Sequence, residues 1–210
     1  MSWIERLISE GEHQCQDFKM RVDDARKIAR TLVAFANTDG GRLLIGVKDN
    51  GTICGVRAEE ELHVIEQAAE MYCKPAIALS SQIWWVNYLP VLEIVVEPSH
   101  TRPHRAENDE GKWIAYMRQA DKNIKANGIT LKVWQHEEER NTTQFEYDEQ
   151  KEQLFDAFQK NEKLGFSRIS RITGLNKWHT EDMLAQLIVW DVVEMVLNEK
   201  GCHFRILDTE

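Results

Sequence analysis

The spacing of hydrophobic residues divides the chain into a longer first part and a shorter second part. Residues 24–36 and 59–72 carry apolar side chains every three or four positions, which predicts two amphipathic helices. The runs RLLIGVKD, QIWWVNYL, PVLEIVVEP and WIAYMR predict strands, with Asp49–Asn50–Gly51 as a hairpin turn into a TICGV partner. Residues 1–135 are therefore expected to form one α+β domain with a mixed sheet and packed helices.

The pattern after residue 148 is different. Residues 136–148 are acidic and polar and predict a linker, and EQKEQLFDAFQKNE after them predicts a helix. Ser167 is expected to cap a second helix that ends near Gly174, and Asn176 to begin a third. VEMVLNEKGCHFRIL then predicts a β-hairpin. This order predicts a small C-terminal winged-helix domain over residues 149–210.

Composition excludes some classes of protein. A hydrophobic fraction of 42% is enough to form a core, which argues against general disorder. A net charge of −9 argues against a generally basic nucleic-acid binder, although a local basic face remains compatible with it. No long apolar run or basic signal sequence occurs, so we expect a cytoplasmic protein without membrane contact. The four cysteines are scattered, which predicts free thiols and no structural metal.

Three motifs resemble a known family. They are GEHQCQDFK, the long segment IARTLVAFANTDGGRLLIGVKDNGTICGV, and the strand residues Tyr116–Met117–Arg118. Over about residues 8–130 the chain resembles the AlbA-like domain of Schlafen proteins and many bacterial regulators. The resemblance implies an AlbA-like mixed sheet and nucleic-acid binding, and bacterial members often carry a C-terminal winged helix.

The same resemblance implies a candidate catalytic group. Some Schlafen proteins are RNases that use three acidic residues, two of them five positions apart, and Glu12 and Asp17 match that spacing. Asp49 is the candidate third residue, and such a trio would hold Mg²⁺ or Mn²⁺. The alternative is that Glu12 and Asp17 pair with nearby cations and that Asp49 only forms a turn. Outside this nuclease hypothesis no cofactor is expected.

Two basic regions are candidate nucleic-acid contacts. In the first part, the candidate phosphate contacts are Lys19, Arg21, Arg42 and Arg118, unless these cations are dispersed and paired with acids.

In the second part, residues 165–180 contain no acid. There Ser167, Arg168 and Arg171 are expected to meet the DNA backbone, while the base or phosphate contacts would be Asn176, Lys177, His179 and Thr180. Glu181 and Asp182 follow at once and are expected to repel phosphate.

Two further features allow more than one interpretation. The Gly40–Gly41 turn is a weak candidate for phosphate binding, because no GxxxxGK[ST] motif accompanies it and glycines also serve tight turns. Trp84 and Trp85 would place one ring on each face of a strand, and the outer ring needs cover, which suggests a homodimer.

The sequence therefore favours a DNA-binding transcriptional regulator, with RNA as a further possible ligand. The alternatives are a metal-dependent endoribonuclease acting on structured RNA and a protein-interaction module.

Overall fold

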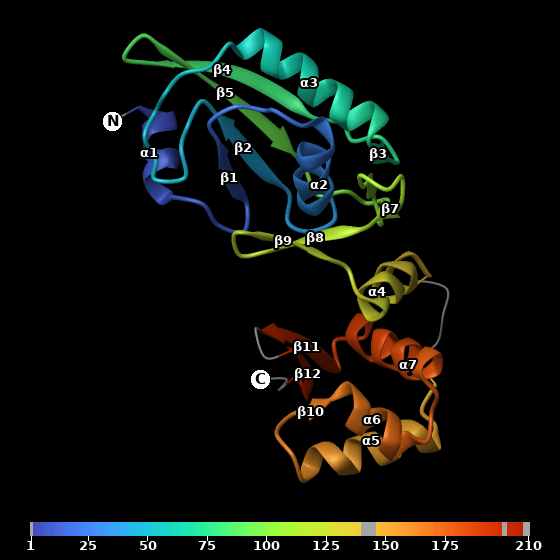
Figure 1. Cartoon of the computed structure of the whole chain (residues 1–210). Coiled ribbons are helices and arrows are strands. Elements are labelled where there is room, and N and C mark those ends of the chain that lie inside the picture. The colour runs from blue at the N-terminus through green and yellow to red at the C-terminus, as the bar shows by residue number, and fades with distance from the viewer. Residues whose placement is uncertain (1, 140–145, 199–200, 208–210) are drawn as a thin grey trace. The chain divides into compact units, whose positions relative to one another are not determined.

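The computed structural model describes residues 2–139, 146–198 and 201–207 (Figure 1). The chain divides into two compact units, Met1–Ala126 and Asn127–Glu210, which we call unit 1 and unit 2. Both contain helices and strands, so the predicted α+β class is confirmed.

Unit 1 is built on a mixed four-stranded sheet in the order β1-β2-β5-β4. β1 and β2 are parallel, and the other neighbours are antiparallel. A three-stranded sheet in the order β3-β6-β7 and the hairpin β8-β9 complete its strands. The elements of unit 1 are α1 (Trp3–Glu10), β1 (Gln16–Lys19), α2 (Ala25–Ala36), β2 (Gly41–Ile45), α3 (Ala58–Met71), β3 (Cys73–Lys74), β4 (Ser80–Val86), β5 (Leu89–Val96), β6 (Arg105–Glu107), β7 (Trp113–Ile114), β8 (Tyr116–Gln119) and β9 (Lys122–Lys125).

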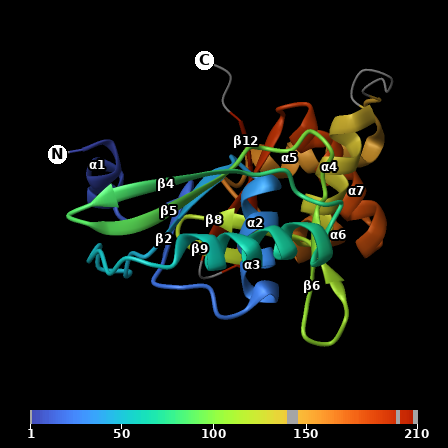
Figure 2. The ribbon, with the colours of Figure 1, turned by 90° about the horizontal axis from the view of Figure 1, so that it is seen from above.

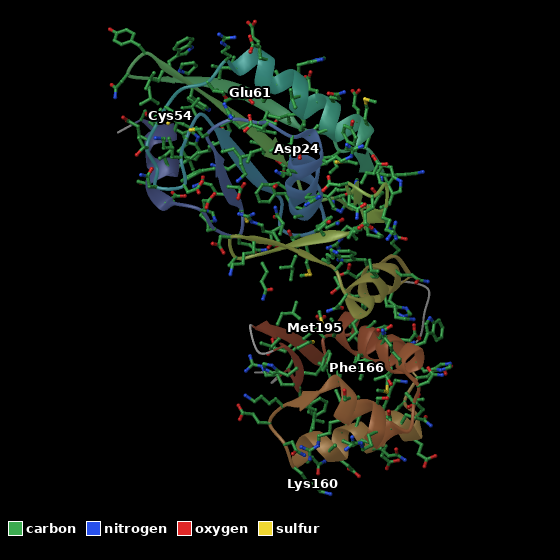
Figure 3. The ribbon with its side chains drawn as sticks, viewed as in Figure 1. Asp24, Cys54, Glu61, Lys160, Phe166 and Met195 are labelled. Carbon is green, nitrogen blue, oxygen red and sulfur yellow. The ribbon has the colours of Figure 1, made fainter. Side chains whose placement is uncertain are left out.

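Helices cover both faces of the four-stranded sheet. Alternate residues of β2 point to opposite faces, so Leu43 and Ile45 join the core under α2 and α3, while Leu44 joins the core under α1. Figure 2 shows α1 and α3 on opposite sides of the strands. Asp24, labelled in Figure 3, fixes the start of α2 because its carboxylate accepts from the backbone N–H groups of Arg26 and Lys27.

Unit 2 contains four helices and a three-stranded sheet in the order β10-β12-β11 within the described residues. Its core joins side chains from the helices and from the β11–β12 hairpin, among them Leu154, Leu184 and Phe204. The elements of unit 2 are α4 (Gly128–Glu139), α5 (Glu149–Gln159), β10 (Leu164–Gly165), α6 (Phe166–Thr173), α7 (Lys177–Val189), β11 (Val193–Asn198) and β12 (Gly201–Ile206).

Several local expectations need correction. TICGV forms no strand beside β2, where only an isolated bridge joins Val47 to Ile53, because β1 and β5 already occupy both edges of β2. Gly165, not Ser167, is the N-cap of α6, so Ser167 lies inside the helix. WIAYMR is divided into β7 and β8 by Ala115.

The boundary between the two units lies earlier in the chain than the sequence pattern predicted. The predicted first domain ended at residue 135, whereas α4 starts at Gly128 and belongs to unit 2, where Ile129 is part of the core. Residues 136–139 of the predicted linker are the end of α4, and residues 140–145 lie outside the described residues.

Candidate nucleic-acid interface

One exposed surface of unit 2 gathers most of the predicted DNA contacts. We call it the α6–α7 surface. Its members are all exposed side chains on α6 or at the start of α7: Ser167, Arg168, Arg171, Asn176, Lys177, Trp178 and His179. The stretch from Gly165 to Thr180 contains no acidic residue.

Local packing sets which side of α6 faces solvent. Ile169 and Thr173 of α6 are buried, whereas Arg168 and Arg171 of the same helix are exposed. Gly174 ends α6 with φ of 66°, a left-handed conformation that suits glycine. The Ser170 hydroxyl then donates to the carbonyl of Leu175 at 2.7 Å, which fixes the turn into α7.

The start of α7 is also fixed locally. Asn176 is the N-cap, and its side-chain oxygen accepts from the backbone N–H of His179 at 3.0 Å. The exposed N-terminal turn of α7 therefore presents Lys177, Trp178 and His179 from a rigid helix end.

The cations of the α6–α7 surface are available to a ligand. Within the described ranges, no side-chain ion pair or hydrogen bond engages Arg168 or Arg171. Lys177 is 81% exposed, and its Nζ lies 3.9 Å from the Glu181 carboxylate, a contact that contributes little at such an exposed position.

A charged cluster lies beside this surface. Asp182 accepts from Lys132 at 3.0 Å and from His136 at 3.1 Å, both on α4. Burial opposes the charged form of Asp182, but these two partners outweigh it and lower the pKa of the carboxyl below its usual value. The repulsion of phosphate expected from Asp182 is therefore largely compensated.

Lys132 is a residue that the sequence interpretation missed. Its Nζ lies 3.7 Å from the centroid of the Trp178 ring, so it connects the charged cluster to the α6–α7 surface. Its spacing of four from His136 places both side chains on one side of a helix. That spacing in the sequence indicates a helix with both side chains on one face. It was overlooked because residues 136–148 were predicted to form a linker.

Thr180 does not belong to the interface. Its side chain is buried, and the hydroxyl donates to the carbonyls of Asn176 at 2.9 Å and Leu175 at 3.3 Å. The predicted base contact at this position is therefore corrected to a structural role.

Three of the cations predicted to bind nucleic acid in unit 1 lie beside carboxylates. Nζ of Lys19 lies 2.6 Å from Asp17, Nε of Arg21 lies 2.7 Å from Asp23, and Nε of Arg42 lies 3.9 Å from Glu93. Five more cations of unit 1 form ion pairs: Arg26, Lys27, Arg30, Arg57 and Lys112. Lys19, Arg21 and Arg42 are therefore less available to a phosphate than Arg168 and Arg171.

Arg118 is a second correction. Only 2% of the residue is exposed, so it cannot reach a phosphate. Its guanidinium donates to the Asp17 carboxylate, to the carbonyls of His13 and Gln16, and to the Asn123 side chain. Arg118 thus fastens β8 to the segment that leads into β1.

The three candidate catalytic carboxylates have separate surroundings. Glu12 accepts from the backbone N–H of Phe18 at 2.9 Å, and Asp17 is buried between Arg118 and Lys19. Asp49 is exposed in the turn after β2. Within the described part of the chain, no three His, Cys, Asp or Glu side chains form a group that could hold a metal ion.

The Gly40–Gly41 turn borders a cavity of about 410 Å³ in unit 1. Glycine is required at both positions for steric reasons. Gly40 has φ of 72°, and a Cβ at Gly41 would lie 2.5 Å from the Phe35 ring. Glu10, Asp39 and Glu97 line the cavity together with Arg42, which makes it unfavourable for phosphate.

Comparison with known proteins agrees with the motifs of the first part. The family described as Schlafen, AlbA_2 matches residues 12–127. The chain belongs to this family. The predicted resemblance is thereby confirmed over unit 1, and the Schlafen AlbA_2 family is related to nucleic acids. None of the curated proteins matches the chain.

Two solved structures are similar to part of this Schlafen AlbA_2 protein. The DIP2311 protein from Corynebacterium diphtheriae is 21% identical with a TM-score of 0.44, over 63% of this chain and 25% of that one. The N-terminal domain of an ATP-dependent DNA helicase RecG-related protein from Nitrosomonas europaea is 21% identical with a TM-score of 0.43, over 57% of this chain and 89% of that one.

None of the helices in the described ranges has the length and apolar character that a bilayer crossing requires.

Proposed function

We propose that this Schlafen AlbA_2 protein is a DNA-binding transcriptional regulator and that unit 2 is the winged helix that contacts duplex DNA. The order α5, β10, α6, α7 and the β11–β12 hairpin supports this assignment, because a winged helix has a helix–turn–helix followed by a hairpin. In such a module the N-terminal residues of the recognition helix enter the major groove. Here that helix is α7.

The observation that carries the proposal is the exposure of Arg168 and Arg171 and their lack of an ion pair within the described residues. Both are exposed and without an ion pair in the described residues, and they lie in a stretch of sequence free of acids, residues 165–180, in a chain of net charge −9. A phosphate that binds Arg168 or Arg171 does not have to displace a carboxylate partner first. Arg168 and Arg171 are therefore assigned to the DNA backbone.

Base contacts are assigned to the start of α7. Lys177 and His179 extend from its first turn, and the Asn176 side chain keeps its NH₂ group for a base or phosphate because its oxygen caps the helix. Trp178 belongs to the same turn, and its ring contacts Nζ of Lys132.

Two further parts of the proposal follow from DNA binding. A homodimer would present two such helices to a DNA site with two-fold symmetry. A cytoplasmic location fits the four cysteines, all of which are free thiols.

The test is a fluorescence anisotropy titration of the full chain with duplex DNA at several salt concentrations. Wild-type affinity should fall steeply as salt rises, and Arg168→Ala and Arg171→Ala should each reduce the salt slope by about one. The matched control is Arg57→Ala, which removes an exposed arginine that is paired with Glu60 in unit 1.

The control should bind like the wild-type protein. A wild-type chain without salt-sensitive binding to any duplex would overturn the proposal, and so would a double Arg168→Ala/Arg171→Ala variant that binds as tightly as wild type.

A further inference from the structure

The strand β4 is an open edge of the four-stranded sheet in unit 1. It pairs with β5 and has no second neighbouring strand within the described residues. Figures 1 and 2 show it on the outer side of β5, in a hairpin that extends beyond the helices. An open edge presents a row of backbone N–H and C=O groups to any other strand.

This edge lacks the usual protection against pairing. Natural edge strands carry lysine, proline or a bulge, whereas β4 reads SSQIWWV, with neither charge nor proline, and pairs in regular register along its whole length. Five of its seven side chains are exposed, among them Ile83 at 40% and Trp85 at 70%. Tyr88, in the turn that follows, is 96% exposed.

We propose that two copies of this chain pair antiparallel along β4, with the two-fold axis at Ile83, and so join their four-stranded sheets into one continuous sheet. The proposal concerns unit 1 and would stand even if unit 2 bound no DNA.

The side chains of β4 are complementary to those of an identical strand. The first half of the strand carries the small residues Ser80 and Ser81, and the second half carries Trp84 and Trp85. In an antiparallel pair centred on Ile83, each Trp85 lies opposite Ser81 of the other copy, so that the large ring covers a small residue. Because Ile83 is the middle residue of the strand, this register pairs all of β4.

The hydrogen-bonding pattern of the hairpin agrees with this register. Asn87 and Tyr88 form a two-residue turn with φ of 48° and 66°, closed by the pair Val86 and Leu89. Residues of an antiparallel strand alternate between its two neighbours, so Ser81, Ile83 and Trp85 direct their backbone groups toward the open edge. These are the residues that the two-fold pairing places opposite one another.

A second copy fits this edge better than a charged partner does. The strand offers no charge for a different protein to recognise, and an identical neutral strand meets no like charge along it. Repulsion between two chains of net charge −9 comes from the rest of the molecule and is screened by salt. Dimerisation should therefore strengthen as salt rises, which is the opposite of DNA binding.

The test is sedimentation velocity of the full chain without DNA. The wild-type protein should sediment as a particle of twice the chain mass of 24.5 kDa. Ile83→Lys should weaken dimerisation roughly 30-fold or more, because it removes a central apolar contact and places two ammonium groups face to face. Met71→Lys is the matched control, since Met71 is an exposed apolar residue on α3, and it should leave the dimer intact.

A mixing experiment tests the two-fold axis itself. Ile83→Lys and Ile83→Glu should each be monomeric alone and should form a heterodimer when mixed, because residue 83 faces residue 83. Circular dichroism should show both variants folded. A monomeric wild type, a dimer that Ile83→Lys leaves intact, or mixed variants that fail to associate would overturn the proposal. The salt dependence of DNA binding by Arg168→Ala tests unit 2 separately from this dimer.

Discussion

Arg118 and Asp17 form a buried ion pair, with Nη2 of the arginine 3.0 Å from Oδ1 of the aspartate. The two residues are 101 positions apart in the sequence, on β8 and β1. Both belong to motifs from which a functional role was predicted. This ion pair connects the β8–β9 hairpin to the four-stranded sheet.

The pair predicts a large effect on stability. Arg118→Ala leaves the Asp17 carboxylate buried without its arginine and removes donors from two backbone carbonyls. The free energy of unfolding of unit 1 should fall by about 3–5 kcal/mol, as measured by urea denaturation. Arg57→Ala, at an exposed pair, should change it by less than about 0.5 kcal/mol. Equal effects of the two substitutions would contradict the structural role of Arg118.

Thr180 predicts a separation between stability and DNA binding. Thr180→Val removes a buried hydroxyl that donates to two carbonyls, so unit 2 should lose about 1 kcal/mol of unfolding free energy. The salt slope of DNA binding should remain that of the wild type. Arg171→Ala should give the reverse result, with a smaller salt slope and unchanged stability. Thermal unfolding and anisotropy on the same samples distinguish the two residues. A reduced salt slope of DNA binding for Thr180→Val would show that Thr180 contacts DNA after all.

The Asp182 cluster predicts a dependence of stability on pH. Because Lys132 and His136 lower the pKa of Asp182 in the folded state, the cluster stabilises unit 2 fully above the ordinary aspartate pKa of about 3.9. That contribution is lost as the pH falls through the lower, folded-state pKa. Unfolding measured from pH 7 to pH 3 should therefore show wild type more stable than Asp182→Asn at neutral pH, with the difference shrinking in acid. A difference that grows toward pH 3 would contradict this assignment.

Much of the fold could be predicted because the signals for its elements are local. The apolar spacing of residues 24–36 and 59–72 corresponds to α2 and α3, and the runs around Trp84 and Leu92 correspond to the β4–β5 hairpin. The missing TICGV strand shows the limit of such signals. A turn sequence predicts a reversal of the chain, but pairing depends on whether the neighbouring edge is free, and β1 occupies it.

The candidate interface could be found from sequence for a similar reason. Its members from Ser167 to His179 are contiguous, so the absence of acids among them is visible without coordinates. The role of Lys132 was missed, because it depends on α4 lying against α7.

The sequence by itself determined the family, the α+β class, most helices and strands, and the acid-free stretch of residues 165–180 with its three cations. Only the tertiary structure decided which cations remain available to a ligand. Arg118 and Arg171 are alike in sequence terms, yet one is enclosed by Asp17 and backbone carbonyls and the other is exposed. The physical reason is that burial and ion pairing depend on residues brought together from distant positions in the sequence. The periodicity of a helix or strand depends only on residues that are close in sequence.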